Sequence, residues 1–174
     1  MALAVCLLLD DRSDRAIRQL WRRLEDDGVT TLLTHTHGHH VPHLSLAVLR
    51  EYDVQAALAA VTALPAAPPT TLHFDALGMF RRSRCWLVPA VPTDLLLRQE
   101  RVVAAVEATG ADLHRHYRPG EWVPHCTLAP RLRLSQLSAV AAAVYDVLPL
   151  TSLVTRAALI ESATGERWPL PHCP

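Results

Sequence analysis

Two short segments of the chain share a pattern that combines a histidine with a hydroxyl side chain. Residues 41–47 and 123–129 both read Val-Pro-His-x-Ser/Thr-Leu-Ala. In an extended strand, residues i and i+2 project from the same face. Each copy therefore presents one imidazole and one hydroxyl together, and the two pairs are His43 with Ser45 and His125 with Thr127.

Two histidines that face one cleft could carry out acid–base chemistry on a phosphate. The unperturbed pKa of histidine is about 6.5, so one ring can be neutral while the other is protonated near neutral pH. The neutral ring takes a proton from the attacking water, and the protonated ring delivers one to the departing alkoxide. Ser45 and Thr127 can donate hydrogen bonds to the non-bridging oxygens, where negative charge accumulates. This scheme requires no metal.

Other interpretations of the histidines stay open. A duplicated strand with a purely structural role would keep the same residues as a catalytic one. A separate segment, residues 34–40, reads Thr-His-Thr-His-Gly-His-His and could bind a transition metal, although no carboxylate or cysteine lies nearby in sequence to complete the site. A solvated loop is the favoured interpretation, with a lid beside His43 as the alternative. We expect no metal and no other cofactor.

Hydrophobic periodicity and capping residues predict the elements that position the two motifs. Strands are expected over residues 2–9, 29–33, 43–49, 70–80, 85–91, 125–131 and 150–161. Helices are expected from the capping region at residues 10–14 to Gly28, and over residues 54–64, 95–109 and 135–147. Asp53 would cap the second helix, and Thr93 or Asp94 the third. The tail from Trp168 is too rich in proline for regular structure.

The order of these elements resembles two copies of a strand–helix–motif-strand–helix unit. Each unit could form a small, mainly antiparallel sheet with helices on its outer face, and the two sheets would flank a central cleft. The predicted fold is therefore α+β, with residues 1–174 forming a single bilobal domain. A chain of this length can bury one sizeable core or two small lobes that share one.

Composition restricts the function further. The 17 basic and 17 acidic residues balance, which disfavours a broad duplex-binding surface but suits a small or terminal phosphate ligand. The four cysteines are far apart and form no Cys-x-x-Cys pair, which favours free thiols in a reducing cytoplasm. No apolar run approaches the roughly 20 residues needed to cross a bilayer, so no membrane partner is expected. Residues 2–9 read as a first strand rather than a leader.

The two motifs, their wide separation and the chain length resemble the 2H phosphoesterase superfamily, and in particular its bacterial 2′-5′ RNA ligase-like branch of RNA 2′,3′-cyclic phosphodiesterases. The likeness covers nearly the whole chain, including a strand ending in Gly-x-Phe within residues 72–82 and the approach to the second motif over residues 118–129. The resemblance implies a bilobal fold whose histidines face each other across a cleft. It implies metal-independent opening of 2′,3′-cyclic phosphates on RNA termini or nucleotides, typically to 2′-phosphates, and for some members reversible 2′-5′ RNA joining. By the same analogy we expect a monomer.

The resemblance also assigns roles to the motif residues. It implies that His43 and His125 are the acid–base pair, with His43 protonating the leaving oxygen and His125 activating water. Ser45 and Thr127 would donate hydrogen bonds to the phosphate, although the branch usually has threonine at the position of Ser45.

Three further residues are candidates for substrate contact. The branch usually reads His-x-Thr-Leu-Ala-Arg, whereas here Pro130 precedes Arg131. Arg131 is the candidate for binding the phosphate or base, in a register shifted by one residue. Trp122 and Tyr117, in the loop before the second motif, could stack a nucleobase.

Two neighbouring features have a less specific interpretation. Phe80 is assigned to the core, and the basic turn at residues 81–84 is either solvated or a phosphate contact at the rim of the cleft. The alternative function is a non-catalytic nucleotide- or RNA-binding module on the same fold, against which the complete histidine and hydroxyl sets argue. A histidine-rich metal-binding protein would rest on residues 34–40 alone.

Overall fold

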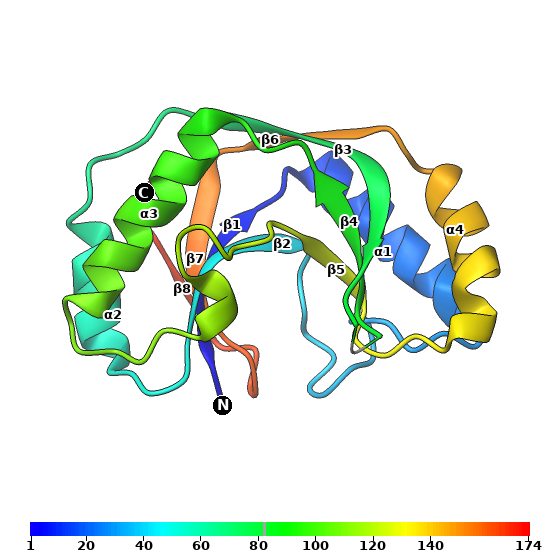
Figure 1. Cartoon of the computed structure of the whole chain (residues 1–174), viewed down its shortest axis with the longest axis horizontal. Helices are drawn as coiled ribbons and strands as arrows, with labels where there is room; N and C mark the ends of the chain where they lie inside the picture. Colours follow the sequence, from blue (N-terminus) through cyan, green and yellow to red (C-terminus); the bar gives the residue numbers. More distant parts are fainter. Residues whose placement is uncertain (82) are drawn as a thin grey trace.

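Two four-stranded antiparallel sheets form the centre of the molecule, with helices outside them (Figure 1). The computed structural model describes residues 1–81 and 83–174. The first sheet contains, in spatial order, β2 (His43–Leu49), β1 (Leu3–Leu8), β7 (Arg156–Glu161) and β8 (Arg167–Pro169). The second sheet contains β5 (Cys126–Ala129), β4 (Cys85–Pro89), β3 (Thr70–Met79) and β6 (Leu150–Val154). The helices are α1 (Asp11–Asp26), α2 (Val54–Thr62), α3 (Thr93–Glu107) and α4 (Leu137–Tyr145), with short 3₁₀ turns η1 (Arg115–Tyr117) and η2 (Leu134–Gln136).

The α+β class and the two mainly antiparallel sheets predicted from the sequence are confirmed. Each motif strand lies at one edge of its sheet. β2, which begins with His43, pairs with β1, and β5, which follows His125, pairs with β4. The two sheets therefore repeat the same local arrangement around their histidines, as the duplicated pattern suggests.

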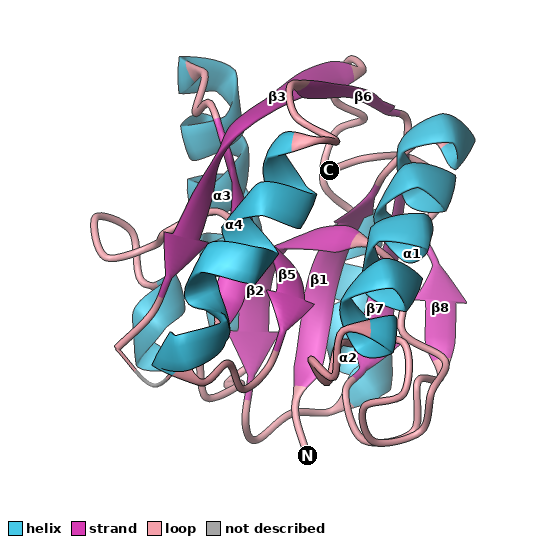
Figure 2. Cartoon of the chain, turned by 90° about the vertical axis from the view of Figure 1, so that its right-hand side faces the viewer, coloured by secondary structure: helices cyan, strands magenta, loops and turns pink. Residues whose placement is uncertain are grey.

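The helices are exchanged between the two sheets. α1 follows β1 of the first sheet but packs against β6 of the second sheet and beside α4. α3 follows β4 of the second sheet but packs against β2 of the first sheet and beside α2. Figures 1 and 2 show α1 and α4 together on one side of the molecule, with α2 and α3 on the other. The expectation that each unit covers its own sheet was wrong, because helical periodicity shows that a helix buries one face but not which sheet it covers.

The start of α1 is fixed to the second sheet by an N-cap. Asp10 Oδ1 accepts a hydrogen bond from Ser13 N at 2.8 Å, inside the first turn of the helix. Asp10 Oδ2 accepts two more from β6, one from Leu153 N at 2.8 Å and one from Ser152 Oγ at 3.0 Å. Below the cap, apolar residues three or four positions apart are buried along one face of α1: Ile17, Leu20, Trp21 and Leu24.

The C-terminal third of the chain departs from the predicted elements. Residues 150–161 form two strands instead of one, because the ladder is broken at the exposed Thr155. On either side of that residue, β6 pairs with β3 of the second sheet and β7 with β1 of the first. The proline-rich tail was predicted to be irregular but contributes β8, in which Trp168 pairs with Leu159. The short strand reaches its place because it lies on the sheet edge, where proline is tolerated.

Several element boundaries also differ from the prediction. Residues 29–33 form no strand: residues 29–31 are irregular and a turn begins at Leu32, whose N donates to Leu128 O of β5 at 3.2 Å. α3 begins at Thr93, two residues earlier than predicted, with Pro92 as its N-cap. Asp53 caps α2 as predicted by accepting from Ala56 N at 2.9 Å. In the basic turn, Arg82 lies outside the described residues.

One cluster of buried apolar side chains extends through both sheets and their helices, and includes Leu7, Trp21, Phe74 and Val103. Each sheet is therefore packed on a core that continues into the other, which holds the two motif strands in a fixed relation. Within residues 1–81 and 83–174, no helix combines the length and the apolar character needed to span a membrane.

Candidate active site

The two motifs meet where the edge strands of the two sheets adjoin, at the centre of Figure 1. His43 is the first residue of β2, and His125 immediately precedes β5, which is shorter than the predicted strand over residues 125–131. A hydrogen bond joins the first motif to the residue that precedes the second: Trp122 Nε1 donates to Ser45 O at 3.1 Å. The structure thus brings together two segments that lie far apart in the sequence.

Each catalytic candidate is held by a hydrogen bond of the same kind, from its ring to the carbonyl two residues earlier. His43 Nδ1 lies 2.7 Å from Val41 O, and His125 Nδ1 lies 2.7 Å from Val123 O. A carbonyl oxygen can only accept, so Nδ1 must carry the proton in each ring. The tautomer assigned on this basis leaves Nε2 of each ring free to accept a proton when neutral or to donate one when charged.

The surroundings of the two rings drive their pKa values apart. Burial alone would lower the pKa of His43. The charge of Cys6, a hydrogen bond to Cys6 and the hydrogen bond to the Val41 carbonyl outweigh burial and raise this pKa to about 9. Burial lowers the pKa of His125 to about 4, and although the Val123 carbonyl opposes this, the charges of Arg84 and His43 add to it. The two pKa values are therefore displaced in opposite directions, so His43 is the ring that favours the protonated state and His125 the ring that favours the neutral one, as an acid–base pair requires.

The two motif hydroxyls lie in different environments. Ser45 is 8% exposed, and its Oγ lies 3.6 Å from Cys6 Sγ, its cross-strand partner on β1. Thr127 is partly exposed and pairs across the ladder with Trp86 of β4. Burial raises the pKa of Tyr117 to about 12, while a hydrogen bond with the Ser45 side chain acts in the opposite direction. The Tyr117 hydroxyl is therefore within reach of Ser45.

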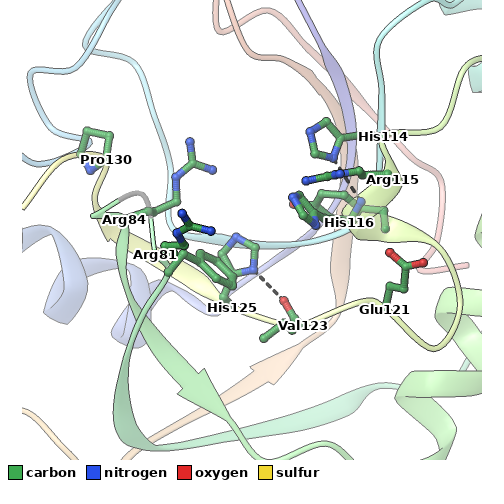
Figure 3. A pocket seen from close by; sticks show the side chains of 11 residues that line it. Arg81, Arg84, His114, Arg115, His116, Glu121, Val123, His125 and Pro130 are labelled. Carbon is green, nitrogen blue, oxygen red and sulfur yellow. Dashed lines mark hydrogen bonds between the residues drawn. The ribbon is translucent and has the colours of Figure 1, made fainter.

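A cavity of about 650 Å³ opens beside His125 (Figure 3). One side is formed by the end of β3 and the turn into β4, and the other by η1 and the residues around it. Three arginines and a single carboxylate line it, so the cavity is cationic although the whole chain is neutral. Its lining consists of Phe80, Arg81, Arg84, His114, Arg115, His116, Tyr117, Glu121, Val123, His125 and Pro130.

Aromatic rings form the wall beside His125. Phe80 and Trp86 stack with ring centroids 4.8 Å apart, and both meet the His125 ring edge-on, at 5.1 Å and 5.6 Å respectively. Gly78 makes room for this wall, since a Cβ there would lie 2.5 Å from Trp86 Cζ2. The assignment of Phe80 to the core was therefore wrong: it lines the cavity, because β3 ends at its edge. The Gly-x-Phe spacing before the basic turn was the available signal.

The remaining candidates are distributed around this cavity. Tyr117 and His125 line it. Trp122 is 8% exposed and bonded to the Ser45 carbonyl, which favours a role in positioning β2 over base stacking. Arg131 is exposed and absent from the cavity lining, whereas Pro130 takes part in it. His43, Ser45 and Thr127 are not among the lining residues, but the charge of His43 contributes to the lowered pKa of His125, which lines the cavity.

Side chains of the histidine-rich loop, residues 34–40, contact one another. The rings of His37 and His40 lie 4.1 Å apart, His40 Nε2 lies 2.9 Å from Thr36 Oγ1, and His39 N donates to His37 Nδ1 at 2.9 Å. Across the part of the chain that the structure describes, no group of three or more His, Cys, Asp or Glu side chains could hold a metal ion. Burial lowers the pKa of His40 to about 4, with the charge of His43 among the further causes, so the loop lies beside the first motif.

Comparison with known proteins identifies the family. A profile of the 2′-5′ RNA ligase superfamily matches residues 9–166. The chain belongs to this superfamily, whose members are 2H phosphoesterases. No curated protein matches the chain. Membership supports a phosphoesterase-type activity and agrees with the resemblance read from the two motifs.

Solved structures of similar fold include LigT of Escherichia coli and Usb1 of Kluyveromyces marxianus. Escherichia coli LigT in its apo form is 19% identical with a TM-score of 0.65, and covers 98% of this chain and 95% of its own. LigT complexed with NADP⁺ is 18% identical with a TM-score of 0.63 and the same coverage, 98% and 95%. Usb1 of Kluyveromyces marxianus is 14% identical with a TM-score of 0.50, and covers 98% of this chain and 96% of its own. At these identities the likeness establishes the 2H phosphoesterase fold.

Proposed function

We propose that this 2H phosphoesterase is a metal-independent phosphodiesterase that opens 2′,3′-cyclic phosphates on RNA termini or nucleotides. The observation that carries the proposal is the opposite displacement of the His43 and His125 pKa values, to about 9 and about 4, with both Nδ1 atoms bonded to carbonyls. One Nε2 is thereby ready to donate a proton and the other to accept one.

The proposed reaction uses each ring once. His125 Nε2 takes a proton from a water molecule, whose oxygen attacks the phosphorus. The bond from phosphorus to the 3′-oxygen breaks, and His43 Nε2–H protonates that oxygen, which leaves a 2′-phosphate. Ser45 and Thr127 donate hydrogen bonds to the non-bridging oxygens, which stabilise the five-coordinate phosphorus. If a 5′-hydroxyl takes the place of water, His125 Nε2 takes its proton, the same bond to the 3′-oxygen breaks and His43 protonates that oxygen, which would join two ends through a 2′-5′ bond. In the reverse of that step the roles of the two rings swap.

The surroundings of the site suit such a substrate. The cavity of about 650 Å³ is within the usual range for a small-molecule site, and its arginines complement a phosphate anion. Complexes of LigT with NADP⁺, ATP and 3′-AMP have been solved, so a relative of the same fold binds nucleotides. Tyr117 provides the aromatic surface nearest Ser45 for a base. We expect the protein to act as a monomer in the cytoplasm, where its four buried cysteines stay reduced.

The alternative is a nucleotide- or RNA-binding module without turnover. One observation favours it: both histidine pKa values lie well away from neutrality, and proton transfer is most efficient when they lie near the working pH. Tight binding of a cyclic nucleotide without cleavage would support this function.

The test is hydrolysis of a panel of nucleoside 2′,3′-cyclic phosphates and 2′-5′-linked dinucleotides, with the products identified as 2′- or 3′-phosphates. His43→Ala and His125→Ala should each lower kcat by about 10²–10⁴-fold. His73→Ala is the matched control, since His73 is exposed on β3 and is not among the lining residues. EDTA should have no effect on the wild type. Full activity in either motif variant would overturn the proposal.

A further inference from the structure

Arg84 directly precedes β4 and Pro130 directly follows β5, at the rim of the cavity. The register pairs Trp86 with Thr127 and then Cys85 with Ala129. One step along β4 thus corresponds to two steps along β5, and Arg84 and Pro130 are the next residues outward from this irregularity. Both line the cavity.

The irregular register determines which side chains face the cavity. Directly opposed residues of an antiparallel pair project from the same face, as do residues two apart on one strand. Arg84 therefore shares the face of Trp86, which touches His125. Figure 3 shows Arg84 on the same side of the pocket as His125. Pro130, which directly follows β5, also lines the cavity but has no charge and no side-chain donor.

Arg131 is directed elsewhere. It is exposed and does not line the cavity. Burial lowers the pKa of His35, and the charges of Arg131 and then Arg84 add to this effect, so both arginines act on the histidine-rich loop while Arg84 alone also lines the cavity. The shift of one residue that Pro130 introduces thus removes this arginine from the cavity.

The charge of Arg84 extends across the site. Burial is the largest cause of the lowered pKa values of His125 and His114, and the positive charge of Arg84 adds to both. His125 lies on the same side of the cavity as Arg84, and His114 lies on the opposite side (Figure 3). Among the described residues, no carboxylate lies within ion-pair distance of Arg84. Its guanidinium is therefore available to an anion.

We propose that Arg84 binds the phosphate of the substrate, in the role that the sequence assigned to Arg131. Its planar guanidinium would hold two oxygens of the phosphate beside His125 and stabilise the charge that develops on them. The ligand chemistry is a cyclic phosphodiester and the phosphomonoester that it yields. The proposal rests on the proposed function of the same site.

Kinetics of four arginine variants test the assignment. With a nucleoside 2′,3′-cyclic phosphate as substrate, Arg84→Gln should lower kcat/KM by about 10²-fold, the usual effect of losing one charge-stabilising donor. Arg84→Lys should regain at least about a tenth of the kcat/KM that Arg84→Gln loses, because lysine restores the charge but cannot donate two hydrogen bonds in the planar geometry of arginine. Arg131→Gln should stay within about 3-fold of the wild type, as should Arg22→Gln, the matched exposed control on α1. A large loss in Arg131→Gln with normal activity in Arg84→Gln would overturn the assignment.

Binding separates this proposal from the proposed function. If the wild type cleaves no cyclic phosphate, the function fails, and Arg84 is tested by titrating inorganic phosphate while following the His125 ring by NMR. Arg84→Gln should weaken phosphate binding by at least about 10-fold and raise the His125 pKa, since it removes a positive charge next to that ring. Equal affinity in the variant, or no binding by the wild type, contradicts the role. Unchanged melting temperatures verify that the variants are folded.

Discussion

Adding one methyl group at Gly78 is predicted to displace Trp86 from the wall beside His125. In Gly78→Ala the new Cβ would lie 2.5 Å from Cζ2 and 2.7 Å from both Cε2 and Cη2 of Trp86, where ordinary contacts begin at 3.4 Å. The ring would have to withdraw by about 0.9 Å at its closest atom. Trp86 is 8% exposed and stacked on Phe80, so the shift pushes the aromatic wall into its neighbours.

The expected cost follows from this displacement. Overpacking of a buried ring typically destabilises a protein by about 1–3 kcal/mol. For a chain of this size, each kcal/mol lowers the melting temperature by about 2–4 °C. Because the wall touches His125, a shift near 1 Å should also lower kcat by up to about 10²-fold. Calorimetry and hydrolysis of a nucleoside 2′,3′-cyclic phosphate measure the two effects.

A second substitution isolates the cause. Trp86→Phe removes the outer ring atoms that the methyl group meets, and it sacrifices no hydrogen bond, since Trp86 Nε1 has no partner among the described residues. Gly78→Ala should therefore be less harmful in the Trp86→Phe background, with a coupling of about 1 kcal/mol or more. Wild-type stability and turnover in Gly78→Ala, or strictly additive effects in the double variant, would refute the reasoning.

Two other predictions concern pH. The ratio kcat/KM should rise as pH increases through about 4 and fall as pH passes about 9, because His125 must be neutral and His43 protonated. Cys6→Ser should move the alkaline limb of this profile to lower pH, because Cys6 raises the His43 pKa. A profile without these limbs contradicts the assignment. Asp10→Ala should lower the free energy of unfolding by about 1–2 kcal/mol near neutral pH, measured in urea, since it removes the cap of α1. Burial would raise the Asp10 pKa, but hydrogen bonds from Ser13 and Leu153 lower it. The carboxylate thus stabilises the fold above its unfolded pKa of about 3.9 and loses this effect as pH falls through the lowered value, so an equal difference at pH 2 and pH 7 would argue against it.

The features that depend on local sequence were predictable. Asp53 caps α2 as expected, and the helical spacing of Ile17, Leu20, Trp21 and Leu24 identified the buried face of α1. The two His-x-Ser/Thr patterns located both histidines at the starts of edge strands, because residue alternation in strands is a local property.

The features that depend on contacts between distant segments were not predictable in the same way. Periodicity could not show that α1 covers the second sheet, nor that the chain changes sheets at Thr155, since both sides of that residue read as one apolar strand. At the site, the neighbours of His125 on β4 follow from an irregular register between Cys85 and Trp86. Counting along β5 alone identified the displacement of Arg131 but could not identify Arg84 as the arginine that faces the cavity.

The exchange of α1 and α3 also determines how the molecule comes apart. Because each of these helices joins one sheet to the other, no cut between the two repeats gives a half whose sheet is covered. Loosening either lobe would expose the core of both, so the lobes form one cooperative unit rather than two bodies on a hinge. The packing of α1 and α3 across both sheets is therefore expected to restrain the separation of the two histidines as well.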